Sequence, residues 1–131
     1  MTPRNSVILI IEDVASVIQF ISAALAADPV QIVTATDGRK GQELVTELLP
    51  DLVLLDLALP EVDGFDVLDS IRADPATATT PVVIITAHGD SSTVAEARNR
   101  GADGFLAKPF QPAELRRVID RFLPHATAAA S

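Results

Sequence analysis

The stretch VILIIED, residues 7–13, decides the fold, because five apolar residues run without a break into two acidic ones. A short continuous run of Val, Ile and Leu predicts a strand that is buried on both faces, as in a parallel sheet. Four further short apolar runs follow along the chain, at 32–35, 52–55, 82–85 and 105–107. The sequence therefore predicts five strands, of which the first ends at Glu12 and Asp13.

The segments between these runs carry apolar residues at helical spacing. In residues 14–27, one face of the predicted helix carries Val17, Ile18, Ile21 and Leu25. Similar patterns end before Pro50 and near Pro75, and two more cover 91–100 and 112–122. Strands that alternate with helices predict an α/β fold, a doubly wound five-stranded parallel sheet with helices on both faces.

Composition and charge exclude several classes of protein. The chain has 131 residues and a net charge of −8, which argues against direct binding to nucleic acid. It has no cysteine, which excludes disulfides and thiolate metal sites. No apolar run approaches the roughly 20 residues that span a bilayer, and the N-terminus has no secretory pattern. We therefore expect one soluble, cytoplasmic domain without membrane contact.

Five polar side chains stand where predicted strands end, and ligands of such sheets bind at the carboxyl ends of the strands. These residues are Glu12, Asp13, Asp56, Thr86 and Lys108. Three carboxylates crowded together repel one another unless a cation holds them. Oxygen ligands select Mg²⁺, Mn²⁺ or Ca²⁺ over zinc. A carboxylate such as Asp56 can attack phosphorus, so the pattern predicts a metal-assisted phosphoryl site.

Each of these residues also has a structural interpretation. Asp13 could cap a helix that starts at Val14, with Glu12 near the positive end of its dipole. Asp56 could be a turn residue, and Thr86 simply a good strand residue. Lys108 could be a solvated surface charge, and a cis bond to the following proline is a further possibility.

Four segments carry a resemblance to a known family. They are ILIIEDV (8–14), DLVLLDLALPEVDGFDVL (51–68), PVVIITAH (81–88) and GADGFLAKPFQPAEL (101–115). In this order and spacing they resemble the receiver domain of response regulators, here apparently a single-domain, CheY-like form. The resemblance covers about residues 5–123 and implies the flavodoxin-like strand order 2-1-3-4-5. Residues 124–131 are expected to form a flexible tail.

The resemblance also implies roles for individual residues. Asp56 would accept a phosphoryl group from a histidine kinase or a histidine phosphotransfer protein. Asp13 and Asp56 would bind Mg²⁺ directly, with the backbone carbonyl of Ala58, and Mn²⁺ could substitute. Glu12 would act through a metal-bound water, while Thr86 and Lys108 would contact the phosphoryl oxygens.

Phe105 stands where the family has a switch aromatic residue, usually Tyr or Phe, and it could equally be an ordinary core residue. Thr86 and Phe105 would together switch the surface formed by 91–100, 105–107 and 112–122, which would bind a downstream protein. The resemblance also implies that Ala58 and His88 occupy the two positions that, in the family, govern the access of water to the acyl phosphate.

Three hypotheses for function follow. The leading one is a two-component signalling switch with slow self-catalysed phosphorylation and dephosphorylation, rather than an enzyme. The alternatives are a non-phosphorylated interaction module and a small phosphatase with an aspartyl nucleophile. The phosphatase is less favoured, because Ala58 stands where such enzymes usually have a second acid.

The state of assembly and the mode of output stay open. The chain could act as a monomer or as a phosphorylation-dependent dimer, and no effector segment follows residue 123, so noncovalent output is expected. The chain could also be part of a longer protein. Five arginines on the last two predicted helices could form a basic docking surface, or could be solvated charges: Arg98, Arg100, Arg116, Arg117 and Arg121.

Overall fold

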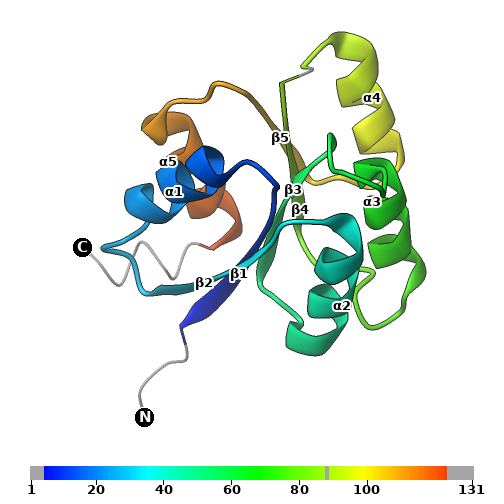
Figure 1. Ribbon diagram of the computed structural model, residues 1–131, viewed down its shortest axis with the longest axis horizontal. Helices are drawn as coiled ribbons and strands as arrows, with labels where there is room; N and C mark the ends of the chain where they lie inside the picture. The colour runs from blue at the N-terminus through cyan, green and yellow to red at the C-terminus, as the bar shows by residue number, and fades with distance from the viewer. Residues whose placement is uncertain (1–4, 88, 124–131) are drawn as a thin grey trace.

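The computed structural model describes residues 5–87 and 89–123, in which five strands alternate with five helices (Figure 1). The strands are β1 (Ser6–Ile11), β2 (Val30–Ala35), β3 (Leu52–Asp56), β4 (Val82–Thr86) and β5 (Gly104–Ala107). The helices are α1 (Ala15–Ala24), α2 (Gly38–Leu48), α3 (Gly64–Ala73), α4 (Ser91–Asn99) and α5 (Pro112–Phe122). His88 and the proposed tail, 124–131, lie outside the described residues.

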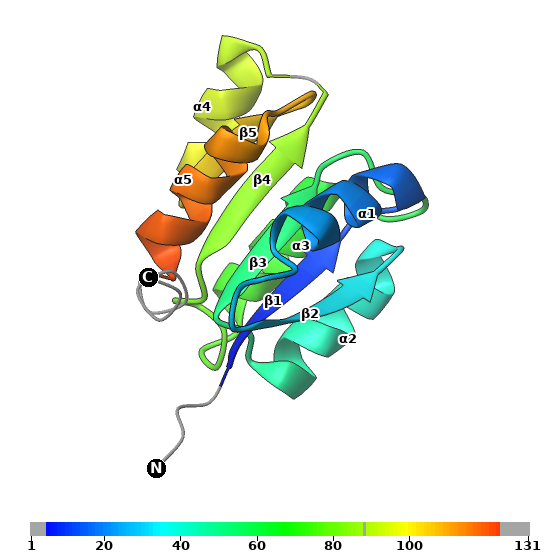
Figure 2. The ribbon, with the colours of Figure 1, turned by 90° about the vertical axis from the view of Figure 1, so that its left-hand side faces the viewer.

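The strands form one parallel sheet in the order β2-β1-β3-β4-β5, which confirms the predicted fold class and strand order. The register aligns the ends of neighbouring strands, since Ile11 pairs with Leu55 and Asp56 pairs with Ile85. The residues that end these strands therefore meet at one edge of the sheet. Figure 2 shows the arrowheads of β1, β3 and β4 pointing to the same end of the molecule.

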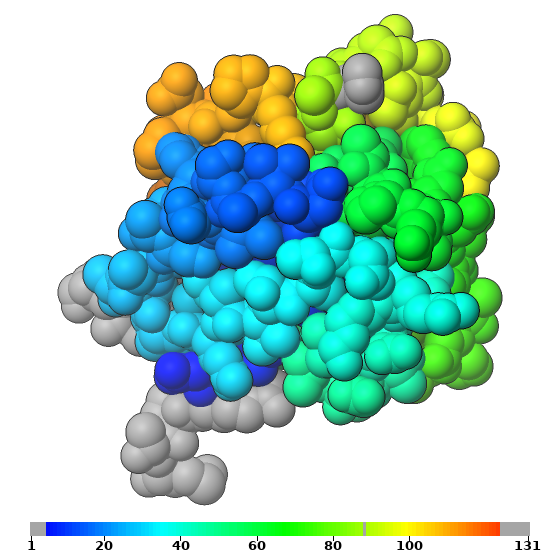
Figure 3. Space-filling model, viewed as in Figure 1, coloured from blue at the N-terminus to red at the C-terminus, as the bar shows by residue number. Residues whose placement is uncertain are grey.

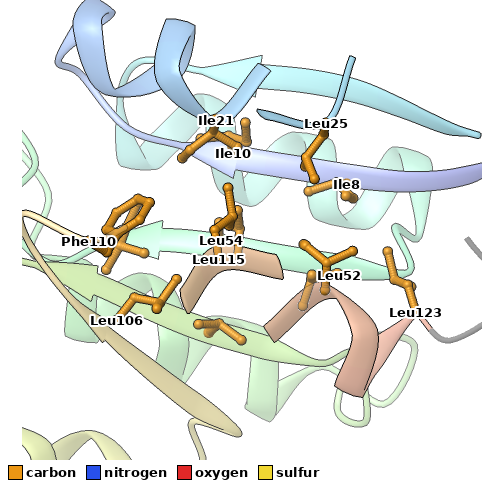
Figure 4. Packing of buried hydrophobic residues seen from close by; sticks show 13 residues of the cluster. Ile8, Ile10, Ile21, Leu25, Leu52, Leu54, Leu106, Phe110, Leu115 and Leu123 are labelled. Atoms are coloured by element: carbon orange, nitrogen blue, oxygen red, sulfur yellow. The ribbon is translucent and has the colours of Figure 1, made fainter. Parts of the chain in front are cut away.

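Helices cover both faces of the sheet and create two hydrophobic cores. One core lies between the sheet and helices α1 and α5, where Ile10, Leu54 and Leu115 are fully buried (Figure 4). The other lies beneath α2, α3 and α4 and includes Leu55 and Val67. Successive strand residues face opposite cores, which explains why the strands are continuously apolar.

Several local boundaries differ from the sequence prediction. The first helix ends at Ala24 rather than at residue 27, because the next residues form tight turns in which Ala26 N–H donates to Ala23 O and Asp28 N–H to Leu25 O. Strand β2 begins at Val30, two residues earlier than predicted. Thr86 is the last residue of β4 rather than the residue after it.

Arg72 links the end of α3 to the segment between α4 and β5 by hydrogen bonds and an ion pair. Its guanidinium donates hydrogen bonds to the carbonyl oxygens of Gly101, Ala78 and Thr80, at 2.9, 3.2 and 2.7 Å. It also pairs with Asp103 at 2.8 Å, and the same carboxylate accepts from Val82 N–H. These contacts hold the end of the sheet opposite to the predicted site.

In the part of the chain that is described, no helix has the length and apolar character needed to cross a membrane.

Candidate functional site

The structure brings the predicted side chains together at the carboxyl ends of the strands. Glu12 follows β1, Asp56 and Thr86 end β3 and β4, and Lys108 follows β5. The ammonium of Lys108 lies 3.0 Å from Asp56 Oδ2 and 2.5 Å from Glu12 Oε1. Glu12 and Thr86 are fully buried, and Asp56 is only 2% exposed. The site is thus a buried group of charges rather than a solvated surface.

Asp13 completes a three-carboxylate cluster. Ligand oxygens of Glu12, Asp13 and Asp56 all lie within 4.8 Å of one another. Asp13 is exposed, so the cluster opens to solvent on its side. The N-cap of α1 is Val14, so the alternative in which Asp13 caps that helix is wrong. An all-oxygen cluster of this kind fits a hard cation such as Mg²⁺.

One oxygen of the buried Glu12 carboxyl lacks a hydrogen-bond donor among the described residues, which supports the fit of a cation to this cluster. Its Oε2 atom accepts a hydrogen bond from Asp13 N–H at 3.0 Å. Its Oε1 atom accepts no hydrogen bond of normal geometry within residues 5–87 and 89–123, although the Lys108 ammonium is close. A buried oxygen of this kind is costly unless another group neutralises it.

Burial and the neighbouring groups shift the pKa values of the two buried carboxyls, Glu12 and Asp56, in opposite directions. Burial, followed by the hydrogen bond and charge of Asp56, raises the pKa of Glu12 to about 7, against the opposing effect of Lys108. Burial alone would raise the pKa of Asp56. However, hydrogen bonds from Glu12, from Ala58 N–H and from Lys108 outweigh it and lower that pKa. Asp56 is therefore the carboxylate that stays ionised, as a nucleophile must.

Lys108 carries the compensating positive charge. Burial would lower the pKa of its ammonium, but the close contacts with the carboxylates of Glu12 and Asp56 and their negative charges raise it. The Lys108 side chain is 18% exposed, so its charge acts in a partly desolvated site. The Lys108–Pro109 bond is cis, an arrangement that the sequence left open. The interpretation of Lys108 as a solvated surface charge is wrong.

The segment after Asp56 is held by backbone contacts that the sequence did not reveal. Ala58 N–H donates to Asp56 Oδ1 at 2.9 Å, and Gly64 N–H donates to Leu57 O at 3.2 Å. A Cβ atom on Gly64 would lie 2.5 Å from Leu57 Cα and 2.6 Å from Asp56 O. Only glycine permits α3 to start so close to β3.

Asp63 and Gly64 have separate structural roles at the start of α3. Asp63 caps α3 by accepting a hydrogen bond from Phe65 N–H at 2.8 Å, while Gly64 lies against the backbone of Asp56 and Leu57. The Asp-Gly pair just before a helical pattern was the available signal. The tertiary approach to β3 was not visible in the sequence.

Two cavities border the site. One, of about 290 Å³, is lined by Leu57, Ala58, Asp63, Phe65, Thr86 and Thr93. The other, of about 440 Å³, is lined by Ser16, Val17, Phe20, Ala87, Lys108, Pro109 and Phe110. In Figure 3, the blue start of α1 adjoins both the orange segment after β5 and the green segment around α3 on one face.

Phe105 lies on β5, paired in register with Ile84, and it is half-buried against the core beneath α3 and α4. A Cβ atom on Gly89 would lie 3.7 Å from its ring, so the aromatic side chain sits beside the loop after β4. This position is consistent with both the switch and the core interpretations.

Comparisons with known proteins establish the family. A family model described as the response regulator receiver domain matches residues 8–120. The chain therefore belongs to the response-regulator receiver domains of two-component systems, as the four sequence segments predicted.

The chain is similar to curated proteins and to solved structures. It is 42% identical over 108 residues to the DNA-binding dual master transcriptional regulator RpaA of Synechocystis, covering 82% of this chain and 45% of that protein. It is 39% identical over 108 residues to the DNA-binding response regulator MtrA of Mycobacterium tuberculosis, covering 82% and 46%. The chain thus spans about half the length of these curated relatives.

Three crystal structures illustrate the similarity of fold. The signal receiver domain of a putative Luxo repressor from Vibrio parahaemolyticus gives a TM-score of 0.86 at 30% identity, covering 95% of each chain. The receiver domain of the sensor histidine kinase PA1611 from Pseudomonas aeruginosa, with magnesium in its active-site cleft, gives 0.83 at 28%, covering 92% and 98%. The Mn²⁺-bound response regulator Rcp1 gives 0.77 at 26%, covering 89% and 93%.

Proposed function

We propose that Asp56 is the phosphoacceptor of this receiver domain, and that the donor is a phosphohistidine on a histidine kinase or a histidine phosphotransfer protein. The supporting observation is the Asp56 carboxylate itself, held ionised between Ala58 N–H and the Lys108 ammonium. It lies at the end of a buried strand, which fixes its backbone. The signalling domain proposed here is 5–123, with 124–131 as its tail.

The transfer needs positioning and charge neutralisation more than additional chemical groups. An Asp56 oxygen attacks phosphorus, an O–P bond forms, and the P–N bond to the donor histidine breaks. The electron pair of that bond goes to the imidazole nitrogen, and Asp56 becomes an acyl phosphate. Lys108 and the hydroxyl of Thr86 would bind the phosphoryl oxygens, where negative charge gathers.

The acidic cluster would hold Mg²⁺, as the magnesium in the PA1611 receiver supports. Asp13, Asp56 and the backbone carbonyl of Ala58 would be direct ligands, and Glu12 would act through water. The bound cation would neutralise charge on the phosphoryl oxygens. Mn²⁺ could take its place, as the Mn²⁺-bound form of Rcp1 supports.

The phosphoryl group would act as a switch. The cavity of about 290 Å³ adjoins Thr86, so its hydroxyl has room to move toward a phosphoryl oxygen. Phe105 lies two residues from the end of β5 and would move inward as Thr86 leaves its resting position. The surface of α4, β5 and α5 would change with it and bind a downstream protein.

The test is incubation of the full chain with Mg²⁺ and acetyl phosphate, followed by intact-mass measurement. We expect a gain of one phosphoryl group that Asp56→Asn abolishes. Asp66→Asn, which changes an exposed aspartate on α3, should keep the gain. Rapid multiple turnover would favour the phosphatase, and no adduct would favour the inert interaction module.

A further inference from the structure

The cavity of about 290 Å³ lies beside the oxygen atoms that would carry the phosphoryl group. Ala58 lines it, and Ala58 N–H donates to Asp56 Oδ1 at 2.9 Å. Thr86 lines it as well, and Thr86 follows Ile85, the residue of β4 that pairs with Asp56. A phosphoryl group on Asp56 would therefore border this cavity. One water occupies about 30 Å³ in the liquid, so the cavity has room for several waters.

Phe65 is the one aromatic side chain among the described residues that line this cavity. It is half-buried, and its backbone has a fixed place relative to the site. Its N–H donates to Asp63 Oδ1 at 2.8 Å, and the preceding Gly64 is so close to β3 that a Cβ atom there would lie 2.6 Å from Asp56 O. The ring of Phe65 is thus attached to the same rigid junction that positions Asp56.

Arg100 holds this ring from the neighbouring helix. Its guanidinium lies over the Phe65 ring, 4.8 Å from the centroid, in a cation–π contact. The same guanidinium bonds to Asp69 on α3 at 2.7 Å and to Glu96 on α4 at 2.9 Å (Figure 1). Asp69 follows Phe65 by four residues, so the two side chains share one face of α3. The ring therefore borders the cavity and also contacts a cation that two carboxylates keep in place.

The lifetime of an acyl phosphate on Asp56 depends on how easily water reaches phosphorus. In hydrolysis, a water oxygen attacks phosphorus and the bond between phosphorus and the Asp56 oxygen breaks. The electron pair of that bond returns to the carboxylate, and a proton of the water passes to the departing phosphate. Ala58 contributes only a methyl group to the lining, so the bulk that excludes water from this cavity has to come from elsewhere.

We propose that Phe65, held by Arg100, sets the lifetime of the phosphorylated state by limiting the entry of water into the cavity beside Ala58 and Thr86. The inference rests on the proposed function, because it requires an acyl phosphate on Asp56. Phe65 also packs against the core beneath α3 and α4, so the test has to separate shielding from packing.

The first measurement is the half-life of the phosphorylated chain. The full chain and its variants are phosphorylated with acetyl phosphate and Mg²⁺, the donor is removed by desalting, and loss of the phosphoryl group is followed by intact mass. We expect Phe65→Ala to shorten the half-life by at least about fivefold. Phe65→Leu and Arg100→Met should shorten it less. Val67→Ala is the matched control, a fully buried residue of α3 that is not among the described lining residues. It should lower the melting temperature but leave the half-life unchanged.

The second measurement is a product ratio that a purely structural role of Phe65 would not move. Hydrolysis in aqueous methanol divides the phosphoryl group between inorganic phosphate and methyl phosphate, which phosphorus NMR resolves. Methanol is larger than water, so a wider entrance should admit it more readily. We expect the proportion of methyl phosphate to rise in Phe65→Ala and to stay at the wild-type value in Val67→Ala.

The outcomes separate this inference from the proposed function. An unchanged half-life and product ratio in Phe65→Ala, or equal shortening by Val67→Ala, would overturn the inference. Greater shortening by Phe20→Ala would also overturn it, by showing that water enters through the other cavity. If Phe65→Ala does not fold, Phe65→Leu and Arg100→Met decide in the same way. Normal uptake with a half-life that is independent of Phe65 refutes the inference alone, whereas no uptake by the wild type refutes the proposed function and the inference with it.

Discussion

Gly64→Ala tests how closely the site depends on the start of α3. The new Cβ atom would lie 2.5 Å from Leu57 Cα and 2.6 Å from Asp56 O, both of them backbone atoms. Carbon atoms in contact normally lie about 3.5–4.0 Å apart, so α3 and the segment after β3 must separate by on the order of 1 Å. Overpacking of this kind destabilises a protein by roughly 1–3 kcal/mol.

The effect on phosphorylation should exceed the effect on stability. A displacement of about 1 Å at a reacting group can cost about 100-fold in rate. We expect phosphoryl uptake from acetyl phosphate to slow by one to two orders of magnitude. The melting temperature should fall by about 3–5 °C for each kcal/mol lost. Uptake is followed by intact mass at a fixed time, and stability by thermal unfolding monitored by circular dichroism.

Gly104→Ala is the matched control for this prediction. Its Cβ atom would meet only side-chain atoms, at 3.2 Å from Val83 Cγ2 and 3.5 Å from the Phe122 ring, at the other end of the sheet. We expect a loss of less than about 1 kcal/mol and an unchanged rate of uptake. The reasoning is refuted if Gly64→Ala melts and phosphorylates like the wild type, or if Gly104→Ala slows uptake equally.

Three further predictions concern other parts of the molecule. The pKa of Glu12 is raised to about 7, so a proton competes with Mg²⁺ at low pH, and calorimetry should show the Mg²⁺ affinity rising between about pH 6 and about pH 8. In Glu12→Gln the affinity should not change with pH, and a pH dependence equal to that of the wild type would exclude Glu12 as its origin. Arg72→Met should lower the free energy of unfolding, measured by urea titration, by about 3 kcal/mol, because three carbonyl oxygens and Asp103 lose their hydrogen-bond donor. Arg98→Met should change the free energy of unfolding by less than about 0.5 kcal/mol, and equal effects of the two substitutions would contradict the role of Arg72. The chain has no tryptophan, so Phe105→Trp gives a single fluorophore whose emission should shift on phosphorylation, and a shift that persists in Asp56→Asn would argue against a switch.

The strands and the convergence of the site were predictable for one physical reason. Strands buried on both faces have to be continuously apolar, so the residue that ends each run is visible in the sequence. Parallel pairing then brings these ends together, which placed Glu12, Asp56 and Lys108 in one site. Helix ends were less predictable, as α1 shows, since tight turns continue the apolar pattern beyond the last helical residue.

Long-range polar contacts were not predictable from the sequence. Arg100 and Arg116 were grouped with the other arginines as candidates for a basic surface, but each has an acidic partner far away in the sequence, Asp69 and Asp28. Gly64 was missed for the same reason, because its close contact with β3 exists only in the folded chain. Charge and glycine roles depend on tertiary neighbours that no local pattern encodes.

Localising the phosphoryl group tests the central claim most directly. Tryptic digestion after exposure to Mg²⁺ and acetyl phosphate should yield a peptide of residues 41–72, which contains Asp51, Asp56, Asp63, Asp66 and Asp69. Fragmentation of this peptide should assign the added mass to Asp56 alone, and chelation of the cation should abolish it. Phosphoryl mass on another of these aspartates, or equal labelling with the cation removed, would contradict the account.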